Sequence, residues 1–177
     1  TTLFRSGFGV KRAGLAIPGS IMLLLAPGCC GRNTAAIGAA DHYGDRFAYF
    51  MLDENDIVTG RHLTRVPEAV KAFVASRRTP PSVVMICITC VDALLGTDME
   101  RVCRKASKAC GLPVLPSYMY ALTRDSRKPP MTAIRQTIYS LLEPRTKDPA
   151  AVNLLGHFSP LMDSCELYTL LRTLGIR

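Results

Sequence analysis

The stretch from Ser82 to Asp98 constrains the fold of this chain more than any other part of the sequence. After Ser82 it continues with Val83–Thr89, which is almost entirely apolar or β-branched, and two prolines precede the stretch. A run of this length and composition, bounded by prolines, is typical of a β-strand that is buried on both faces. The next residue is Cys90. The sequence therefore predicts a buried strand with a cysteine at its carboxyl end.

A short turn and then a helix should follow this strand. Thr97–Glu100 has the form of a helix capping box, and apolar residues recur at helical spacing within Met99–Cys110. Gly111 should end the helix, and Leu112–Leu115 should form the next strand. We expect the two strands of this β-α-β unit to be parallel neighbours. Ligands bind at the carboxyl edge of such sheets, which is where Cys90 is placed.

A second unit of the same kind precedes this one. Ile21–Leu25 predicts a short buried strand, followed by a tight turn that contains Cys29 and Cys30. A helix through Ala40 should follow the turn, and Phe47–Met51 predicts a further strand. The fold class that these units predict is α/β, with a Rossmann-like parallel sheet flanked by helices.

The remaining segments predict shorter elements and a domain boundary. Asp53–Asp56 should form a polar turn, and Pro67 should start a helix. Thr132–Leu142 has a helical pattern, Ala151–Gly156 predicts a strand, and Ser164–Leu174 predicts a helix. We expect residues 7–149 to form a first α/β domain and residues 150–177 to begin a second, truncated one. Residues 1–6 resemble a translated sequencing adapter, so we treat them as non-native.

Composition narrows the class of protein. The 177 residues are 48% hydrophobic, which indicates a globular chain. The longest apolar run, Ile21–Ala26, is too short to span a bilayer, and no signal peptide is visible. The seven cysteines therefore favour a reducing, cytoplasmic compartment. The net charge of +8 is accompanied by no nucleic-acid motif, so we interpret it as a solvated surface or one that faces an acidic partner protein.

Two cysteines lie where metal chemistry is favoured. Cys30 and Cys90 occupy strand-to-helix turns, where exposed backbone N–H groups can hydrogen-bond to the sulfur of an iron–sulfur cluster ligand. Cys29 is a possible additional ligand. Cysteines inside a strand or helix pack as small hydrophobic residues instead, and this group comprises Cys87, Cys103 and Cys110.

Other chemistries are less favoured. Cys87 and Cys90 form a C-x-x-C pair, but strand alternation points the two side chains to opposite faces, which argues against dithiol exchange. The three histidines lie far apart in the sequence, and no P-loop, G-x-S-x-G or H-E-x-x-H motif is present. An α/β small-molecule-binding domain with only structural cysteines remains an alternative.

The order of these motifs resembles the catalytic-component (component 1) subunits of nitrogenase and nitrogenase-like oxidoreductases. Leu23–Gly31 is similar to the family's short apolar strand and the glycine-proline-x-glycine-cysteine turn after it, with Cys30 at the family cysteine. Asp53–Gly60 is similar to its glutamate-x-aspartate-valine-valine-x-glycine segment. Val83–Asp98 resembles the family's threonine-cysteine…isoleucine-glycine-aspartate-aspartate segment, with Cys90 at the ligand position.

The likeness runs from about Gly19 to Arg177, with departures. Ala26 and Cys29 stand where the family has glycine, and Arg61 stands where it often has a second glycine. Further similar segments are Gly111–Val114, Val152–Gly156 and Leu170–Ile176.

The resemblance implies a subunit of an oxidoreductase enzyme, inactive as an isolated fragment. Cys30 and Cys90 would hold an iron–sulfur cluster shared with a second component 1-type subunit. An ATP-dependent iron–sulfur reductase protein would deliver electrons through this cluster to a substrate or metallocofactor. The alternative within the family is a non-catalytic scaffold for metal-cluster cofactor assembly. The resemblance gives no reason to expect a nucleic-acid or membrane partner.

Overall fold

The computed structural model describes residues 10, 13–28, 30, 45–119, 128–144, 146–156 and 164–176. Three expectations fall outside these residues: the non-native segment 1–6, the possible ligand Cys29, and the helix that we predicted through Ala40.

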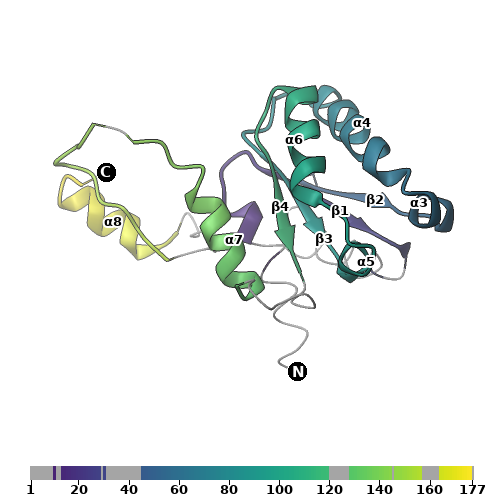
Figure 1. Ribbon diagram of the computed structural model, residues 1–177. Coiled ribbons are helices and arrows are strands. Elements are labelled where there is room, and N and C mark those ends of the chain that lie inside the picture. Colours follow the sequence, from purple (N-terminus) through teal and green to yellow (C-terminus); the bar gives the residue numbers. More distant parts are fainter. Residues whose placement is uncertain are drawn as a thin grey trace.

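A parallel β-sheet forms the centre of the described chain (Figure 1). Its four strands there are β1 (Ile21–Ala26), β2 (Phe47–Met51), β3 (Val84–Ile88) and β4 (Val114–Tyr118), in the order β2-β1-β3-β4. Every neighbouring pair in this sheet is parallel. The prediction that the buried strand and the strand after Gly111 are parallel neighbours is therefore confirmed.

Helices cover both faces of the sheet (Figure 1). Odd-numbered side chains of β1 and even-numbered side chains of β3 form one core with α4 (His62–Ala75) and α6 (Met99–Cys110). The alternate side chains of both strands form a second core with α7 (Pro130–Tyr139) and residues 13–15. Because both faces are buried, the strands are apolar throughout rather than alternating. The prediction of an α/β fold with a parallel sheet flanked by helices is confirmed.

Two expectations after β2 are wrong. The polar turn predicted at Asp53–Asp56 is the start of helix α3 (Glu54–Thr59), because Asp53 and Asp56 exchange the reciprocal side-chain-to-backbone hydrogen bonds of a capping box. Pro67 does not start its helix but lies inside α4, which begins at His62. Burial of Val66 and Pro67 against the core compensates for the backbone hydrogen bond that the proline removes.

The segment after β3 also differs from expectation. Helix α5 (Cys90–Leu94) follows the strand where a simple turn was predicted. Helix α6 is capped by Asp98 rather than Thr97: the Asp98 carboxylate accepts a hydrogen bond from the Arg101 backbone N–H at 2.9 Å. The predicted stop at Gly111 is confirmed, since its φ of 72° is in the left-handed region.

The carboxyl-terminal segment has little packing within the described residues. Residues 151–156 form no strand, contrary to prediction, because no partner strand lies beside them in the described chain. Helix α8 (Glu166–Thr173) is formed close to its predicted position, but it has no buried residue. The start of a second domain after residue 149 stays a prediction. No described helix has the length and apolar character that crossing a membrane requires.

Candidate functional site

Cys30 and Cys90 follow neighbouring strands at the same edge of the sheet. β1 and β3 are parallel and paired, with Leu25 opposite Ile88, so their carboxyl ends lie together. Cys30 comes shortly after the end of β1, and Cys90 is the first residue of α5, directly beyond β3. The topology thus brings both predicted ligands to the edge where parallel sheets bind ligands.

The turn that carries Cys30 is held by hydrogen bonds. The Cys30 backbone N–H donates to the Pro27 carbonyl oxygen at 3.0 Å. The Tyr49 hydroxyl lies 2.9 Å from the carbonyl oxygen of Ala26 and 2.6 Å from that of Pro27, and can donate to either. Cys30 itself is half-buried against the core on the α7 face, whereas Cys90 is exposed. The chain therefore fixes the backbone near Cys30 and leaves Cys90 open to a partner.

The remaining described cysteines have structural surroundings. Cys87 is fully buried in the same core against which Cys30 packs, as expected for a strand position. Burial raises the pKa of the Cys103 thiol to about 12, with Glu100 adding to the shift. A thiol with such a pKa stays protonated and unreactive at neutral pH. The Cys110 thiol contacts the carbonyl oxygens of Ser107 and Leu112 at the end of α6.

The residues at this edge fit half of an iron–sulfur site. Such clusters usually take four cysteine ligands, and the described residues contain no group of three His, Cys, Asp or Glu side chains placed to hold a metal ion. Cys30 and Cys90 would supply two thiolates to such a cluster. Thr89 adds a possible donor, because its hydroxyl is buried beside Cys90, makes no capping bond to α5 and has no hydrogen-bond partner among the described residues. A complete site therefore needs ligands from elsewhere.

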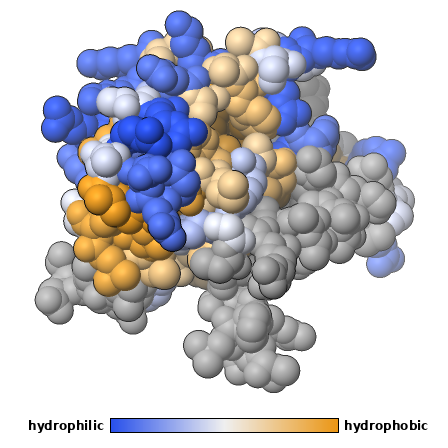
Figure 2. Space-filling view, turned by 90° about the vertical axis from the view of Figure 1, so that its right-hand side faces the viewer, coloured by the Kyte–Doolittle hydropathy of each residue, from blue (hydrophilic) through white to orange (hydrophobic). Residues whose placement is uncertain are grey.

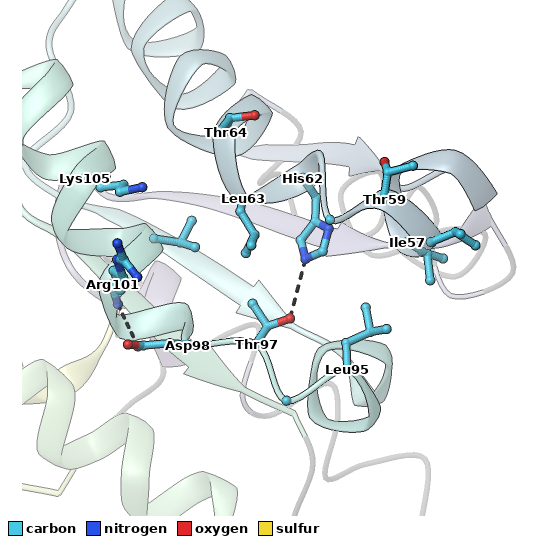
Figure 3. Close-up of a pocket in the computed structure, with 14 residues that line it drawn as sticks. Ile57, Thr59, His62, Leu63, Thr64, Leu95, Thr97, Asp98, Arg101 and Lys105 are labelled. Carbon is cyan, nitrogen blue, oxygen red and sulfur yellow. Dashed lines mark hydrogen bonds between the residues drawn. The ribbon is translucent and has the colours of Figure 1, made fainter.

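A buried polar cluster lies beside this edge, and no sequence motif indicates it. His62 is 2% exposed, at the start of α4. Its Nδ1 lies 2.9 Å from the Asp56 carbonyl oxygen. Its Nε2 lies 3.5 Å from the Thr97 hydroxyl and 3.8 Å from Asp92 Oδ1. Figure 3 shows the imidazole of His62 and the Thr97 hydroxyl pointing toward each other. The imidazole thus joins the end of the α3–α4 region to the 92–97 segment, which lies about 30 residues further along the chain.

The two carboxylates of this region have opposite electrostatic environments. Burial raises the pKa of Asp92 to about 6, and the charge of His62 only partly offsets it. Burial also acts to raise the pKa of Asp56, but its hydrogen bonds with Arg65 and the Asp53 backbone, and the charges of Arg65 and Arg61, outweigh burial and lower it. The surroundings of Asp56 therefore stabilise its charged form, whereas burial destabilises the charged form of Asp92.

A cavity of about 660 Å³ opens beside His62 (Figure 3). It lies between the α3–α4 connection and the amino-terminal half of α6. Its polar lining includes His62, Thr97, Arg101 and Lys105, and its apolar lining includes Leu63. The cavity gives solvent and small solutes access to the His62 imidazole.

The surface near this edge is partly apolar. The side of the molecule that carries α3 and α5 shows hydrophobic side chains next to charged ones (Figure 2). The most exposed large apolar side chains of these elements are Val58 of α3, at 84%, and Leu94 of α5, at 80%; Met51 at the end of β2 is 61% exposed. Exposed apolar surface that is rimmed by charge is characteristic of protein–protein interfaces.

Sequence comparison shows what this chain is related to. It is similar to proteins named nitrogenase iron-molybdenum cofactor biosynthesis protein NifE. The match to the one from Sinorhizobium fredii is 31% identical and covers 71% of this chain and 26% of that protein. The match to the one from Mesorhizobium japonicum is 32% identical, with the same coverage. The match to the one from Rhodobacter capsulatus is 29% identical and covers 88% of this chain and 34% of that protein.

The chain therefore spans about a quarter to a third of the length of these relatives. The family model for nitrogenase component 1 type oxidoreductases matches residues 6–177. This range includes both cysteine turns and nearly the whole chain. The chain belongs to the nitrogenase component 1 type oxidoreductase family.

Proposed function

We propose that this chain is part of a component 1-type subunit that holds an iron–sulfur cluster at an interface with a second subunit of the same type. Cys30 and Cys90 supply this chain's ligands. The observation that carries the proposal is their position after two paired parallel strands, at one edge of the sheet. The exposure of Cys90 and the apolar surface near it support a site that is completed by another protein.

The cluster would supply one-electron chemistry, with electrons from an ATP-dependent iron–sulfur reductase protein. The protein's own contribution is to fix the ligands and their hydrogen bonds. The turn at Cys30 is held by the Tyr49 hydroxyl and by its own backbone hydrogen bond. Thr89 offers a buried hydroxyl next to Cys90, and a hydrogen bond from it to a ligand sulfur would raise the reduction potential.

Two roles are compatible with this cluster site: reduction of a substrate, and assembly of a metal-cluster cofactor. The relatives favour assembly, because the three described above are named as cofactor biosynthesis proteins. We therefore propose an assembly subunit as the whole protein's role, with substrate-reducing oxidoreductase as the second candidate.

The cluster site is tested by cysteine substitution in the full-length two-subunit complex, purified without oxygen. Cys30→Ala and Cys90→Ala should each abolish the iron–sulfur absorbance. Cys103→Ala is the matched control and should retain it, because Cys103 is buried in the core between the sheet and α6. Wild-type iron content in both Cys30→Ala and Cys90→Ala would contradict the proposed ligands.

The two roles are separated by a transfer assay. The complex is loaded with cluster, reduced by the reductase with ATP, and mixed with a cofactor-free component 1 acceptor. An assembly subunit should pass molybdenum and iron to the acceptor and activate it. Direct reduction of small substrates by the complex, without transfer of metal, would instead support the second candidate.

A further inference from the structure

We propose that His62, Asp92 and Thr97 bind a divalent transition-metal ion such as zinc, at a site separate from the cysteine edge. The donors would be His62 Nε2, a carboxylate oxygen of Asp92 and the hydroxyl of Thr97. The imidazole and the carboxylate are common ligands of zinc and its first-row neighbours, and the threonine hydroxyl is a weaker third donor. The proposal does not depend on the function proposed above.

The spacing of the donor atoms is close to that of a coordination sphere. His62 Nε2 lies 3.5 Å from Thr97 Oγ1 and 3.8 Å from Asp92 Oδ1. With metal–ligand bonds of about 2.0–2.1 Å, the ligands of a tetrahedral site lie roughly 3.3–3.4 Å apart. The donors therefore need to approach by only a few tenths of an ångström. Both distances are long for direct hydrogen bonds, so contacts between these groups do not by themselves account for the arrangement.

The second nitrogen of His62 has the partner that metal-binding histidines usually have. Nδ1 lies 2.9 Å from the carbonyl oxygen of Asp56. Because a carbonyl can only accept, Nδ1 carries a proton, and a metal ion that takes the place of any proton on Nε2 would meet a lone pair directed toward Asp92 and Thr97. A backbone carbonyl on the other ring nitrogen orients the imidazole and strengthens it as a ligand.

The Asp92 carboxylate is the second, independent observation. Its side chain is fully buried, and neither oxygen has a hydrogen-bond partner among the described residues. Its one charged neighbour in this cluster is His62, at 3.8 Å, and only when that ring is protonated. A buried carboxylate without a hydrogen-bond partner is costly, and such groups are normally hydrogen-bonded, paired or bound to a metal ion. The described residues contain no site with three His, Cys, Asp or Glu ligands; here the third donor is a threonine hydroxyl.

The remaining coordination position has access to water. His62 and Thr97 both line the cavity of about 660 Å³ beside α6, so an ion can enter there and keep a water ligand. Bound metal would connect the start of α4, helix α5 and the turn before α6. Because α5 begins at Cys90, such a cross-link would hold the cysteine turn in place.

The site is tested by zinc binding in a Cys30→Ser/Cys90→Ser background of the intact protein, which removes the thiolates that would also bind zinc. After chelation and equilibrium dialysis against zinc, the background protein should retain about one zinc ion per chain. Asp92→Asn and His62→Gln should each weaken that binding by at least about tenfold. Asp148→Asn, which changes an exposed aspartate outside the cluster, should bind zinc as the background does.

Asp92→Asn keeps the test valid even if His62→Gln fails to fold. Its volume is nearly unchanged and it removes a buried charge that has no hydrogen-bond partner among the described residues, so it should still fold when metal is chelated. Unchanged zinc affinity in Asp92→Asn would overturn the proposal. X-ray absorption of the zinc-bound background protein should show only nitrogen and oxygen ligands, including imidazole. A sulfur ligand in that spectrum would place the zinc at another cysteine and overturn it as well.

Discussion

Asp56 is a buried carboxylate on which the α3–α4 corner depends. It accepts a hydrogen bond from Arg65, lies 3.4 Å from the Arg61 guanidinium, and completes the α3 capping box with Asp53. Arg65 in turn lies over the Phe50 ring at 5.3 Å, so the charge cluster is joined to the end of β2. One carboxylate therefore fixes the direction in which the chain leaves the sheet for α4.

We predict that Asp56→Asn lowers the free energy of unfolding by about 2 kcal/mol at pH 7, because Arg61 and Arg65 lose their buried charged partner and keep only the half-exposed Asp53. The lowered pKa of Asp56 means that its contribution is complete above the unfolded-state pKa of about 4 and is lost as pH falls through the folded-state value. The difference between variant and wild type in urea unfolding should therefore shrink below pH ~4. A difference that stays constant down to pH 2 would contradict this assignment.

At the scale of single residues, the sequence predicted the positions of Cys30 and Cys90 better than the buried polar cluster around His62. Cys30 and Cys90 stand at turns between recognisable strands and helices, so their shared edge follows from the topology of parallel sheets. Whether their sulfurs lie within one cluster's reach stays a prediction. His62 and Asp92 belong to different helices and meet only through tertiary packing, which has no signature in local spacing. An aspartate inside the apolar segment after Cys90 was the one available signal.

Among the elements, α6 shows how a cap is chosen between two candidates. Thr97 and Asp98 both have side chains able to cap a helix. The Asp98 carboxylate accepts from Arg101 N–H, while the Thr97 hydroxyl faces His62. Capping by a carboxylate also benefits from the positive end of the helix dipole. The helix therefore starts one residue later than the sequence pattern indicated.

This assignment predicts different costs for the two neighbours. Asp98→Ala should lower stability by about 1 kcal/mol, the usual contribution of an N-cap. Thr97→Ala should change it by less than half of that in metal-free buffer, because the Thr97 hydroxyl makes no capping bond. Chemical denaturation of both variants, with EDTA present, measures the comparison. A larger loss for Thr97→Ala would show that it caps the helix after all.

The elements themselves were predictable where apolar patterns are strong. The strands around Ile21–Leu25, Phe47–Met51 and Val83–Thr89 and the helix at Met99–Cys110 follow directly from such patterns. Helix α3 was missed because it has only six residues and its capping aspartates are equally common in turns. The strand expected at residues 151–156 did not form, since a strand requires a neighbour that local sequence cannot supply.

At the scale of the whole molecule, the packing is uneven between the two ends. The sheet and its helices form a dense core, whereas α8 has no buried residue and its Leu170 and Leu174 are 54% and 61% exposed. The aligned residues cover 26% and 34% of the relatives from Sinorhizobium fredii and Rhodobacter capsulatus, so these relatives are nearly three times as long as this chain. We therefore keep the prediction that residues 150–177 belong with a further α/β domain.

The first six residues are expected to behave differently from the rest. If they are not native to this protein, they were never selected to pack against its core. Deleting residues 1–6 should therefore leave the melting temperature unchanged within error. Calorimetry of the deletion variant beside the parent chain makes the comparison, and a decrease of several degrees would show that the segment belongs to the fold.

The strand order also dictates when this protein can fold during synthesis. β1 lies in the interior of the sheet between β2 and β3, and Ile21 pairs with Val84. One side of β1 therefore stays without its partner until the ribosome has released β3. During that interval the apolar strand Ile21–Ala26 is open to wrong pairing with other nascent chains. Slowing translation before residue 84 should therefore increase aggregation and the dependence on chaperones, whereas slowing it after β4 should not.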